Sequence, residues 1–112
     1  MTKNYINAFA DYDNADAFEA VMQNLSSLNV IDSSWQNDTC PSVVVLDGAQ
    51  ERIRIYIDYN DVNLREYDCV GVYGVLVFND EFEAVVDEMF DDQDAAIQFV
   101  KAQAAAHNLI QA

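Results

Sequence analysis

The residues in this sequence most able to do chemistry are carboxylates concentrated between positions 80 and 94. This segment contains no Lys or Arg, and its acidic residues are Asp80, Glu81, Glu83, Asp87, Glu88, Asp91, Asp92 and Asp94. Clustered carboxylates can hold a cation, exchange protons in catalysis or attract a basic macromolecule. Each of these three roles requires different residues near the carboxylates.

Two segments begin like calcium-binding loops but lack the residues that complete one. In the segment that starts at Asp11, the sixth position is Asp16 instead of Gly and the twelfth is Met22 instead of Glu. The segment from Asp58 to Asn63 also lacks the turn glycine and the closing glutamate. A calcium loop of this kind needs both. We therefore predict no metal site and no cofactor, with weak binding of Ca²⁺ or Mg²⁺ as the alternative.

Catalytic side chains other than carboxylates are scarce. The single histidine, His107, lies in an alanine-rich segment, where an interaction with a helix dipole is a simpler role than general-base catalysis. Cys40 and Cys69 have neither CxxC spacing nor a neighbouring histidine. We expect buried thiols, with a disulfide as the alternative. Because the sequence offers no nucleophile with a base and an orienting residue, we predict that the protein is not an enzyme.

The acidic segment has the hydrophobic pattern of a helix. Large apolar residues recur with helical period at Phe82, Val85, Val86, Met89 and Phe90. Asp80 and Glu83 have the spacing of a capping box at the start of such a helix. Carboxylates would then repeat about every 6 Å along one face, as a stripe of Asp80, Glu83, Asp87, Asp91 and Asp94. Phosphates along a DNA strand recur on a similar scale.

A solvated helix face is the simpler interpretation of the same run, since most charge runs are solvated. An ordinary exposed helix, however, usually carries Lys or Arg four residues away from its acids, and this segment has neither. The absence of compensating bases favours a surface that binds a basic partner. The predicted partner-binding residues are Asp80, Glu83, Asp87, Glu88, Asp91, Asp92, Asp94, Asp58 and Tyr56.

Net charge narrows the choice of partner. The 112 residues include 20 acidic and five basic side chains, which gives a formal net charge of −15. Nucleic acid and anionic membranes are poor direct partners for such a surface. A basic nucleic-acid-binding protein suits it, because that protein already has a surface shaped for polyanions.

Composition also predicts a folded domain. The sequence is 52% hydrophobic, with one Pro and three Gly, unlike a disordered acidic tail. This length fits one domain covering residues 1–112. Neither a secretory leader nor an apolar run of membrane-spanning length is recognisable, so we expect a location in the cytosol of a host cell.

The clearest structural element is a β-hairpin. A β-branched run over residues 43–46 is followed by the turn signal Asp47-Gly48 and by strict alternation over residues 52–59. The alternation places Ile53, Ile55, Ile57 and Tyr59 on the core face, and Arg52, Arg54, Tyr56 and Asp58 on the other. Tyr56 is therefore a candidate contact residue on an outward sheet face. Such a face is also suited to a homodimer interface.

Other segments complete the predicted fold. We expect strands over residues 5–10 and 70–78, the latter with a bulge near Gly74, and a short edge strand at 30–31. Helices are predicted over residues 15–28, over 82–90 and after the acidic turn at 91–94. The order β-α-β-β-β-α-α predicts a two-layer α+β domain with three helices on an antiparallel sheet of about four strands.

In size and charge over the whole chain, the sequence resembles the small acidic DNA-mimic proteins that phages and plasmids use against restriction or CRISPR systems. The resemblance implies an inhibitor or decoy that blocks the DNA- or RNA-binding surface of a defence complex. Two alternatives remain. One is an acidic interaction domain adapted to a saline cytoplasm, and the other is a small enzyme or weak cation-binding domain.

Overall fold

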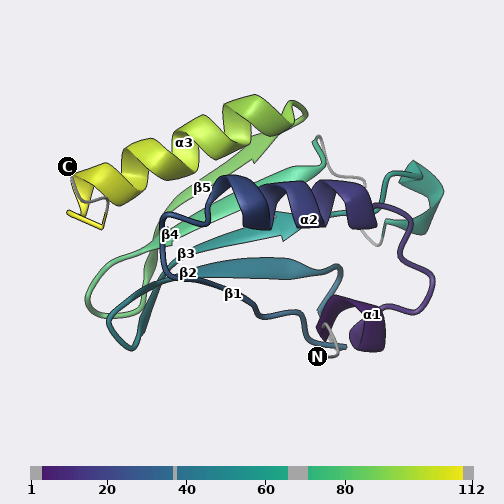
Figure 1. Ribbon diagram of the computed structural model, residues 1–112, viewed down its shortest axis with the longest axis horizontal. Helices are drawn as coiled ribbons and strands as arrows, with labels where there is room; N and C mark the ends of the chain where they lie inside the picture. Colours follow the sequence, from purple (N-terminus) through teal and green to yellow (C-terminus); the bar gives the residue numbers. More distant parts are fainter. Residues whose placement is uncertain (1–3, 37, 66–70, 110–112) are drawn as a thin grey trace.

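The centre of the protein is an antiparallel β-meander. The computed structural model describes residues 4–36, 38–65 and 71–109 (Figure 1). Its strands are β1 (Val30–Asp32), β2 (Ser42–Asp47), β3 (Gln50–Ile57), β4 (Tyr73–Phe78) and β5 (Ala84–Phe90). They form one five-stranded sheet in the order β1-β2-β3-β4-β5. Each strand thus pairs with its neighbour in sequence, and β1 and β5 are the two edges.

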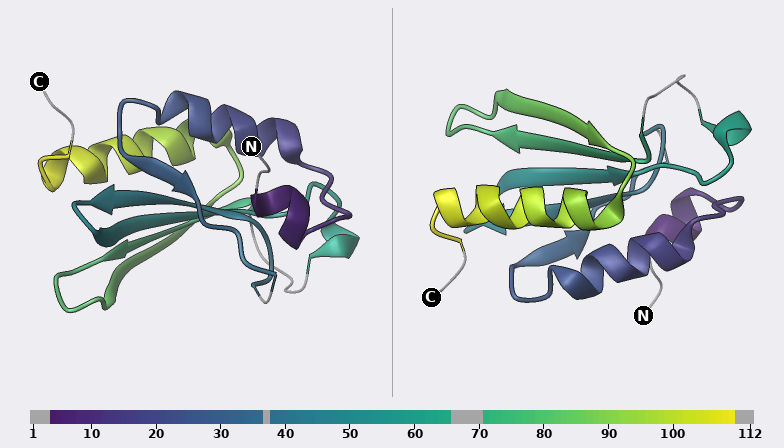
Figure 2. Two further views of the ribbon diagram at one scale, coloured as in Figure 1. Left: turned by 60° about the horizontal axis from the view of Figure 1, so that its bottom comes forward. Right: turned by 90° about the horizontal axis from the view of Figure 1, so that it is seen from above.

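Two helices cover one face of this sheet. They are α2 (Ala15–Asn24) and α3 (Gln93–Ala106), and both lie on the same side of the strands (Figure 2). The described residues also form a short helix α1 (Asn4–Ala8) and a 3-10 turn η1 (Val62–Leu64). The α+β class is confirmed. Among the residues that the structure describes, no helix is long and apolar enough to span a membrane.

The core lies between the helices and the sheet. In β3, Ile53, Ile55 and Ile57 alternate toward the helices and are at most 1% exposed, as the hairpin pattern predicts. The helices contribute buried side chains from one face each, namely Phe18, Val21 and Leu25 from the α2 region and Ile97, Val100 and Ala104 from α3. Each large apolar side chain buried in this way stabilises the fold by about 1.5–3 kcal/mol.

The predicted hairpin is confirmed. Asp47 pairs with Gln50 across a two-residue turn of Gly48 and Ala49. Gly48 has a φ of +63°, a conformation that glycine adopts without steric cost. Tyr59 is buried as predicted, although it packs with Phe9 in a second, smaller cluster rather than in the main core.

The N-terminal prediction was wrong, because the segment expected as a strand over residues 5–10 begins with helix α1. Tyr5 and Phe9 lie four residues apart and are both buried. The N–H of Phe9 donates to the carbonyl oxygen of Tyr5 at 3.0 Å. Side chains at this interval share a face of a helix, so both rings point inward, Tyr5 into the main core and Phe9 into the smaller cluster.

The helix predicted over residues 82–90 was also wrong, since this segment is the edge strand β5. Asn79 organises the turn that leads into it. Its side-chain oxygen accepts the backbone N–H groups of Glu81 and Glu83 at 2.9 and 3.0 Å, and its own N–H donates to the carbonyl of Glu83. Asp80 therefore starts no helix. The sheet has five strands rather than about four.

The register of β4 corrects a further expectation. Pairing with β3 runs without interruption through Gly74, where a bulge was predicted. The irregularities lie elsewhere, between Val45 and Leu46 in β2 and between Val77 and Phe78 in β4. The short edge strand predicted at residues 30–31 is present as β1, and the final helix is present as α3.

Candidate functional site

Many of the acidic side chains stabilise the fold by accepting backbone N–H groups. The Asp13 carboxylate accepts the N–H groups of Asn60 and Asp61 at 2.8 and 2.9 Å, so the two loops that resemble calcium loops in sequence bind each other. Asp92 caps α3 by accepting the N–H of Ala95. Within the described ranges, no group of three or more His, Cys, Asp or Glu side chains could hold a metal ion.

Asp80, the first residue of the predicted stripe, belongs to a structural ion pair. The Arg52 guanidinium is buried and donates to Asp47 and Asp80, each at 2.9 Å, and to the carbonyl of Phe78 at 2.8 Å. Hydrogen bonding to Asp80 is the main cause that raises the pKa of Arg52, against the opposing effect of burial. Arg52 thereby joins the β2–β3 turn to the β4–β5 turn.

A second group of carboxylates does not join parts of the fold through hydrogen bonds or ion pairs within the described residues. Six side chains accept no hydrogen bond and form no ion pair within the described part of the chain, and all six are exposed: Glu81, Glu83, Asp87, Glu88, Asp91 and Asp94. They lie in the β4–β5 turn, along β5 and at the start of α3. Because β5 is a sheet edge of seven residues, they border an edge about 24 Å long. We call this group the acidic edge.

The acidic edge is not the predicted stripe. In a strand, successive side chains point to opposite faces, so Asp87 lies on the face away from the helices and Glu88 on the other. The register agrees, since Asp87 pairs with Leu76 whereas Glu88 pairs with the core residue Val75. A helical spacing of carboxylates on one face therefore does not exist in this segment.

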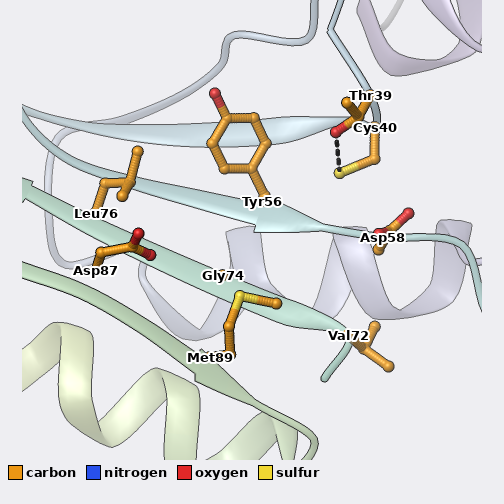
Figure 3. A pocket seen from close by; sticks show the side chains of 9 residues that line it. All are labelled: Thr39, Cys40, Tyr56, Asp58, Val72, Gly74, Leu76, Asp87 and Met89. Carbon is orange, nitrogen blue, oxygen red and sulfur yellow. Dashed lines mark hydrogen bonds between the residues drawn. The ribbon is translucent and has the colours of Figure 1, made fainter. Parts of the chain in front are cut away.

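The face of the sheet opposite the helices contains a hollow of about 170 Å³ (Figure 3). Its floor lies at Gly74, which pairs with Tyr56 on one side and Met89 on the other. A Cβ atom at position 74 would come within 3.1 Å of the Met89 sulfur, so the lack of a side chain lets Met89 pack closely against the floor. The lining residues are Thr39, Cys40, Tyr56, Asp58, Val72, Gly74, Leu76, Asp87 and Met89.

Two carboxylates lie on opposite sides of Gly74 in this hollow (Figure 3). Asp58 is only 8% exposed, and burial raises the pKa of its carboxyl group. The N–H of Tyr59, which donates to Asp58 at 2.8 Å, opposes that shift. Asp87, at the other side, is exposed and belongs to the acidic edge.

Tyr56 forms an aromatic wall of the hollow. Burial is the main cause that raises the pKa of its hydroxyl group, and the negative charge of Asp38 adds to the shift. The guanidinium carbon of Arg54 lies 5.8 Å from the centre of the Tyr56 ring, within the range of a cation–π interaction. The ring is therefore already in contact with one cation of the protein itself.

Exposed apolar side chains accompany the acids at this edge. Phe82, Val85 and Met89 are 70%, 60% and 42% exposed. Met89 lies two residues from Asp87 in the regularly paired part of β5 and shares its face, so an apolar residue stands beside the acid. Exposed apolar groups near unpartnered charges are typical of surfaces that bind another protein.

The predicted site residues thus fall into three groups. Asp80 and Asp92 stabilise turns and helix ends, as described above. Glu83, Glu88, Asp91 and Asp94 belong to the acidic edge, whereas Asp58, Tyr56 and Asp87 line the hollow. Sequence reasoning placed Glu81 in the acidic run but not in the site, and it missed Gly74, Leu76 and Met89. A glycine inside a β-branched strand is the one signal that could have indicated the hollow.

His107 lies at the C-terminal end of α3, as predicted. Cys40 is buried, and Cys69 lies outside the described residues, as does any pairing that involves it.

The sequence matches no family model, and comparisons with curated proteins and with solved structures gave no match. Within the described residues, the site joins carboxylates without a hydrogen-bond or ion-pair partner to exposed apolar side chains.

Proposed function

We propose that this protein is an acidic inhibitor that binds the Lys- and Arg-rich surface of a nucleic-acid-binding protein and keeps DNA or RNA away from it. The observation that carries the proposal is the acidic edge, in which six exposed carboxylates have no partner within the described residues. The proposed target class includes restriction and CRISPR-type complexes in a host cytosol.

The structural roles of the acids outside the acidic edge support this proposal. Asp13, Asp80 and Asp92 contribute to the fold through hydrogen bonds or an ion pair. The acids of the edge form no hydrogen bond or ion pair within the described residues, and their mutual repulsion opposes folding. A binding role accounts for that repulsion, because a basic partner would neutralise it and the field would accelerate encounter.

Protection of the sheet edge is the simplest competing explanation. Charged side chains on an edge strand prevent pairing with other sheets. That role accounts for Asp87 and Glu88 within β5. It does not account for Glu81, Asp91 and Asp94, which lie outside the strand, nor for the exposed apolar residues beside them.

The proposed inhibition depends on charge and contact area and not on copying the spacing of phosphates. Asp87 and Glu88 face opposite sides of the sheet, so the edge offers no row of evenly spaced carboxylates. A basic groove that surrounds the edge would contact both faces of β5. A flat basic surface would contact only one.

The test is competition with nucleic acid. The immobilised protein is exposed to a lysate that contains restriction or CRISPR machinery, and each captured protein is purified and assayed for displacement of its labelled DNA or RNA. We expect displacement that weakens as salt is raised. A variant with Glu81→Gln, Glu83→Gln, Glu88→Gln, Asp91→Asn and Asp94→Asn should associate at least about 10-fold more slowly.

The control is Asp16→Asn, which removes one exposed charge from the first turn of α2, away from the edge. Each edge substitution is also made singly for comparison with it. Displacement that is unchanged in the five-fold variant would show that the acidic edge is not the binding surface. A captured protein that keeps its nucleic acid would contradict the inhibitory role.

A further inference from the structure

The hollow over Gly74 has the size of a site for one side chain. Its volume of about 170 Å³ is below the range of about 300–1,000 Å³ that is usual for small-molecule sites. It is open on the uncovered face of the sheet, next to the acidic edge, and Asp87 belongs to both. A partner bound at the edge would therefore pass over the hollow.

The lining indicates the chemistry of the occupant. Leu76, Val72 and Met89 supply apolar walls, and Asp58 and Asp87 supply negative charge at two sides. The described residues that line the hollow include no Lys, Arg or His. A side chain with a long apolar stem and a cationic end complements this combination, since its stem can cover apolar surface while its charge meets a carboxylate.

Arginine fits better than lysine. Its guanidinium is planar and weakly hydrated, can bond a carboxylate through two N–H groups and can stack on an aromatic ring. The protein already holds guanidinium groups in both ways. Arg52 donates to the Asp47 carboxylate through two of its nitrogens, and Arg54 lies over the Tyr56 ring that walls the hollow.

We propose that the hollow over Gly74 binds an arginine side chain of the basic partner. The apolar stem lies over Gly74 between Leu76 and Met89, and the guanidinium donates to the Asp87 carboxylate. The inference rests on the proposed function for the identity of the partner. The arginine contact adds a defined anchor to the long-range electrostatic attraction of the acidic edge. It also makes binding depend on the position of an arginine in the partner.

The first test examines the hollow without any partner. N-acetyl-arginine-N-methylamide is titrated into the ¹⁵N-labelled protein, with the neutral citrulline analogue and the apolar norleucine analogue as matched probes. We expect saturable shifts of the Gly74 and Met89 amide signals with the arginine probe alone. Equal shifts with norleucine, or arginine-induced shifts confined to acids outside the hollow, would overturn the proposal.

Two variants test the two parts of the proposed contact, the floor at Gly74 and the carboxylate of Asp87. Gly74→Val adds a side chain to the floor, where the nearest atom is the end of the flexible Met89 side chain, and a β-branched residue suits a strand. Asp87→Asn removes the carboxylate at an exposed position and leaves the backbone unchanged. Each should weaken binding of the arginine probe about 10-fold or more. Asp91→Asn, the same charge change on the edge outside the hollow, should weaken it far less.

Failure of this inference differs from failure of the proposed function. If the arginine probe does not bind but the five-fold edge variant loses the partner, the edge is the binding surface and the hollow is not an anchor. If the probe binds and Gly74→Val abolishes its binding, but the edge variant still displaces nucleic acid normally, the arginine site stands and the proposed function of the edge does not. Circular dichroism of Gly74→Val confirms folding, and Asp87→Asn provides the test should that variant misfold.

Discussion

Asp58 shows how burial of a single carboxylate shapes the stability of this protein. Burial raises the pKa of its carboxyl group, so a proton binds the folded state more tightly than the unfolded state. The protonated carboxyl group therefore contributes its full stability below the ordinary Asp pKa of about 3.9. This contribution is lost as the pH rises through the pKa that Asp58 has in the folded state. Ionisation of Asp58 is therefore a cost to the folded protein above the folded-state pKa.

Asp58→Asn should therefore change the pH dependence of stability. An amide keeps an oxygen to accept the Tyr59 N–H but has no charge to desolvate. We expect the free energy of unfolding of the variant, relative to that of wild type, to increase as the pH rises from 3 and then to level off above the folded-state pKa. Urea denaturation over this range measures it. Asp16→Asn corrects for the loss of one negative charge, and a difference independent of pH would contradict the prediction.

Other single residues show why charge counts alone mislead. Asp13, Asp80 and Asp92 look equivalent to the edge acids in the sequence, yet each has a hydrogen-bonded or ion-paired role in the fold. The roles of Asp13 and Asp80 depend on loops that meet only in three dimensions, whereas Asp92 caps the helix that follows it directly. The sequence could locate the acidic run, but it could not separate the acids that stabilise the structure from those left for a partner.

At the scale of elements, β5 and its turn decide the shape of the acidic surface. Phe82 stands in the turn with a φ of +63°, in the left-handed region, and its side chain is 70% exposed. This conformation costs about 1–2 kcal/mol for a residue with a side chain. Val85 lies in the following strand, where a β-branched residue is favoured.

A pair of glycine substitutions tests this assignment. Phe82→Gly should leave the free energy of unfolding unchanged or raise it by about 0.5 kcal/mol, because relief at positive φ offsets the entropy of glycine. Val85→Gly, at a similarly exposed position, should lower it by about 1 kcal/mol. Chemical denaturation measures both. Equal destabilisation by the two substitutions is the result expected of a helix and would refute the turn and strand described here.

The two hairpins explain why one element was predictable and the other was not. In β3, an apolar residue alternates with a polar one because one face is buried against the helices, which gives period two without ambiguity. Around β5, the pairs Val85-Val86 and Met89-Phe90 satisfy a helical period equally well. An edge strand exposed on much of both faces has little reason to alternate. Gly74 could have indicated the hollow, but the residues that line it were unpredictable for a related reason, since they depend on the registers of three strands.

At the scale of the whole molecule, the excess of negative charge acts on stability. The net charge is −15, and the molecule measures 39 × 33 × 26 Å. At 0.01 M ionic strength the screening length is about 30 Å, so most of the charges repel one another, whereas at 1 M it is about 3 Å. The folded state holds these charges closer together than the unfolded chain does, so screening by salt stabilises the folded state more.

Salt should therefore stabilise the protein. Between 0.01 M and 0.5 M NaCl, we expect the melting temperature to rise by about 4 °C or more, which corresponds to about 1 kcal/mol. Differential scanning calorimetry measures it, with MgCl₂ at equal ionic strength as the comparison. A melting temperature that stays constant would contradict the role given to repulsion. A much larger rise with magnesium would reveal a specific cation site.

The order of the strands has a kinetic consequence. Because β1 to β5 pair in sequence order, each pairing closes a short segment of chain, and the crossover connections that parallel sheets require are not needed. Local pairing keeps the entropy of loop closure small, which favours rapid folding for a sheet of this size. A chain that pairs its strands quickly leaves the β5 segment without its β4 partner only briefly. Once the sheet is complete, the carboxylates of β5 keep its edge from pairing with strands of other molecules.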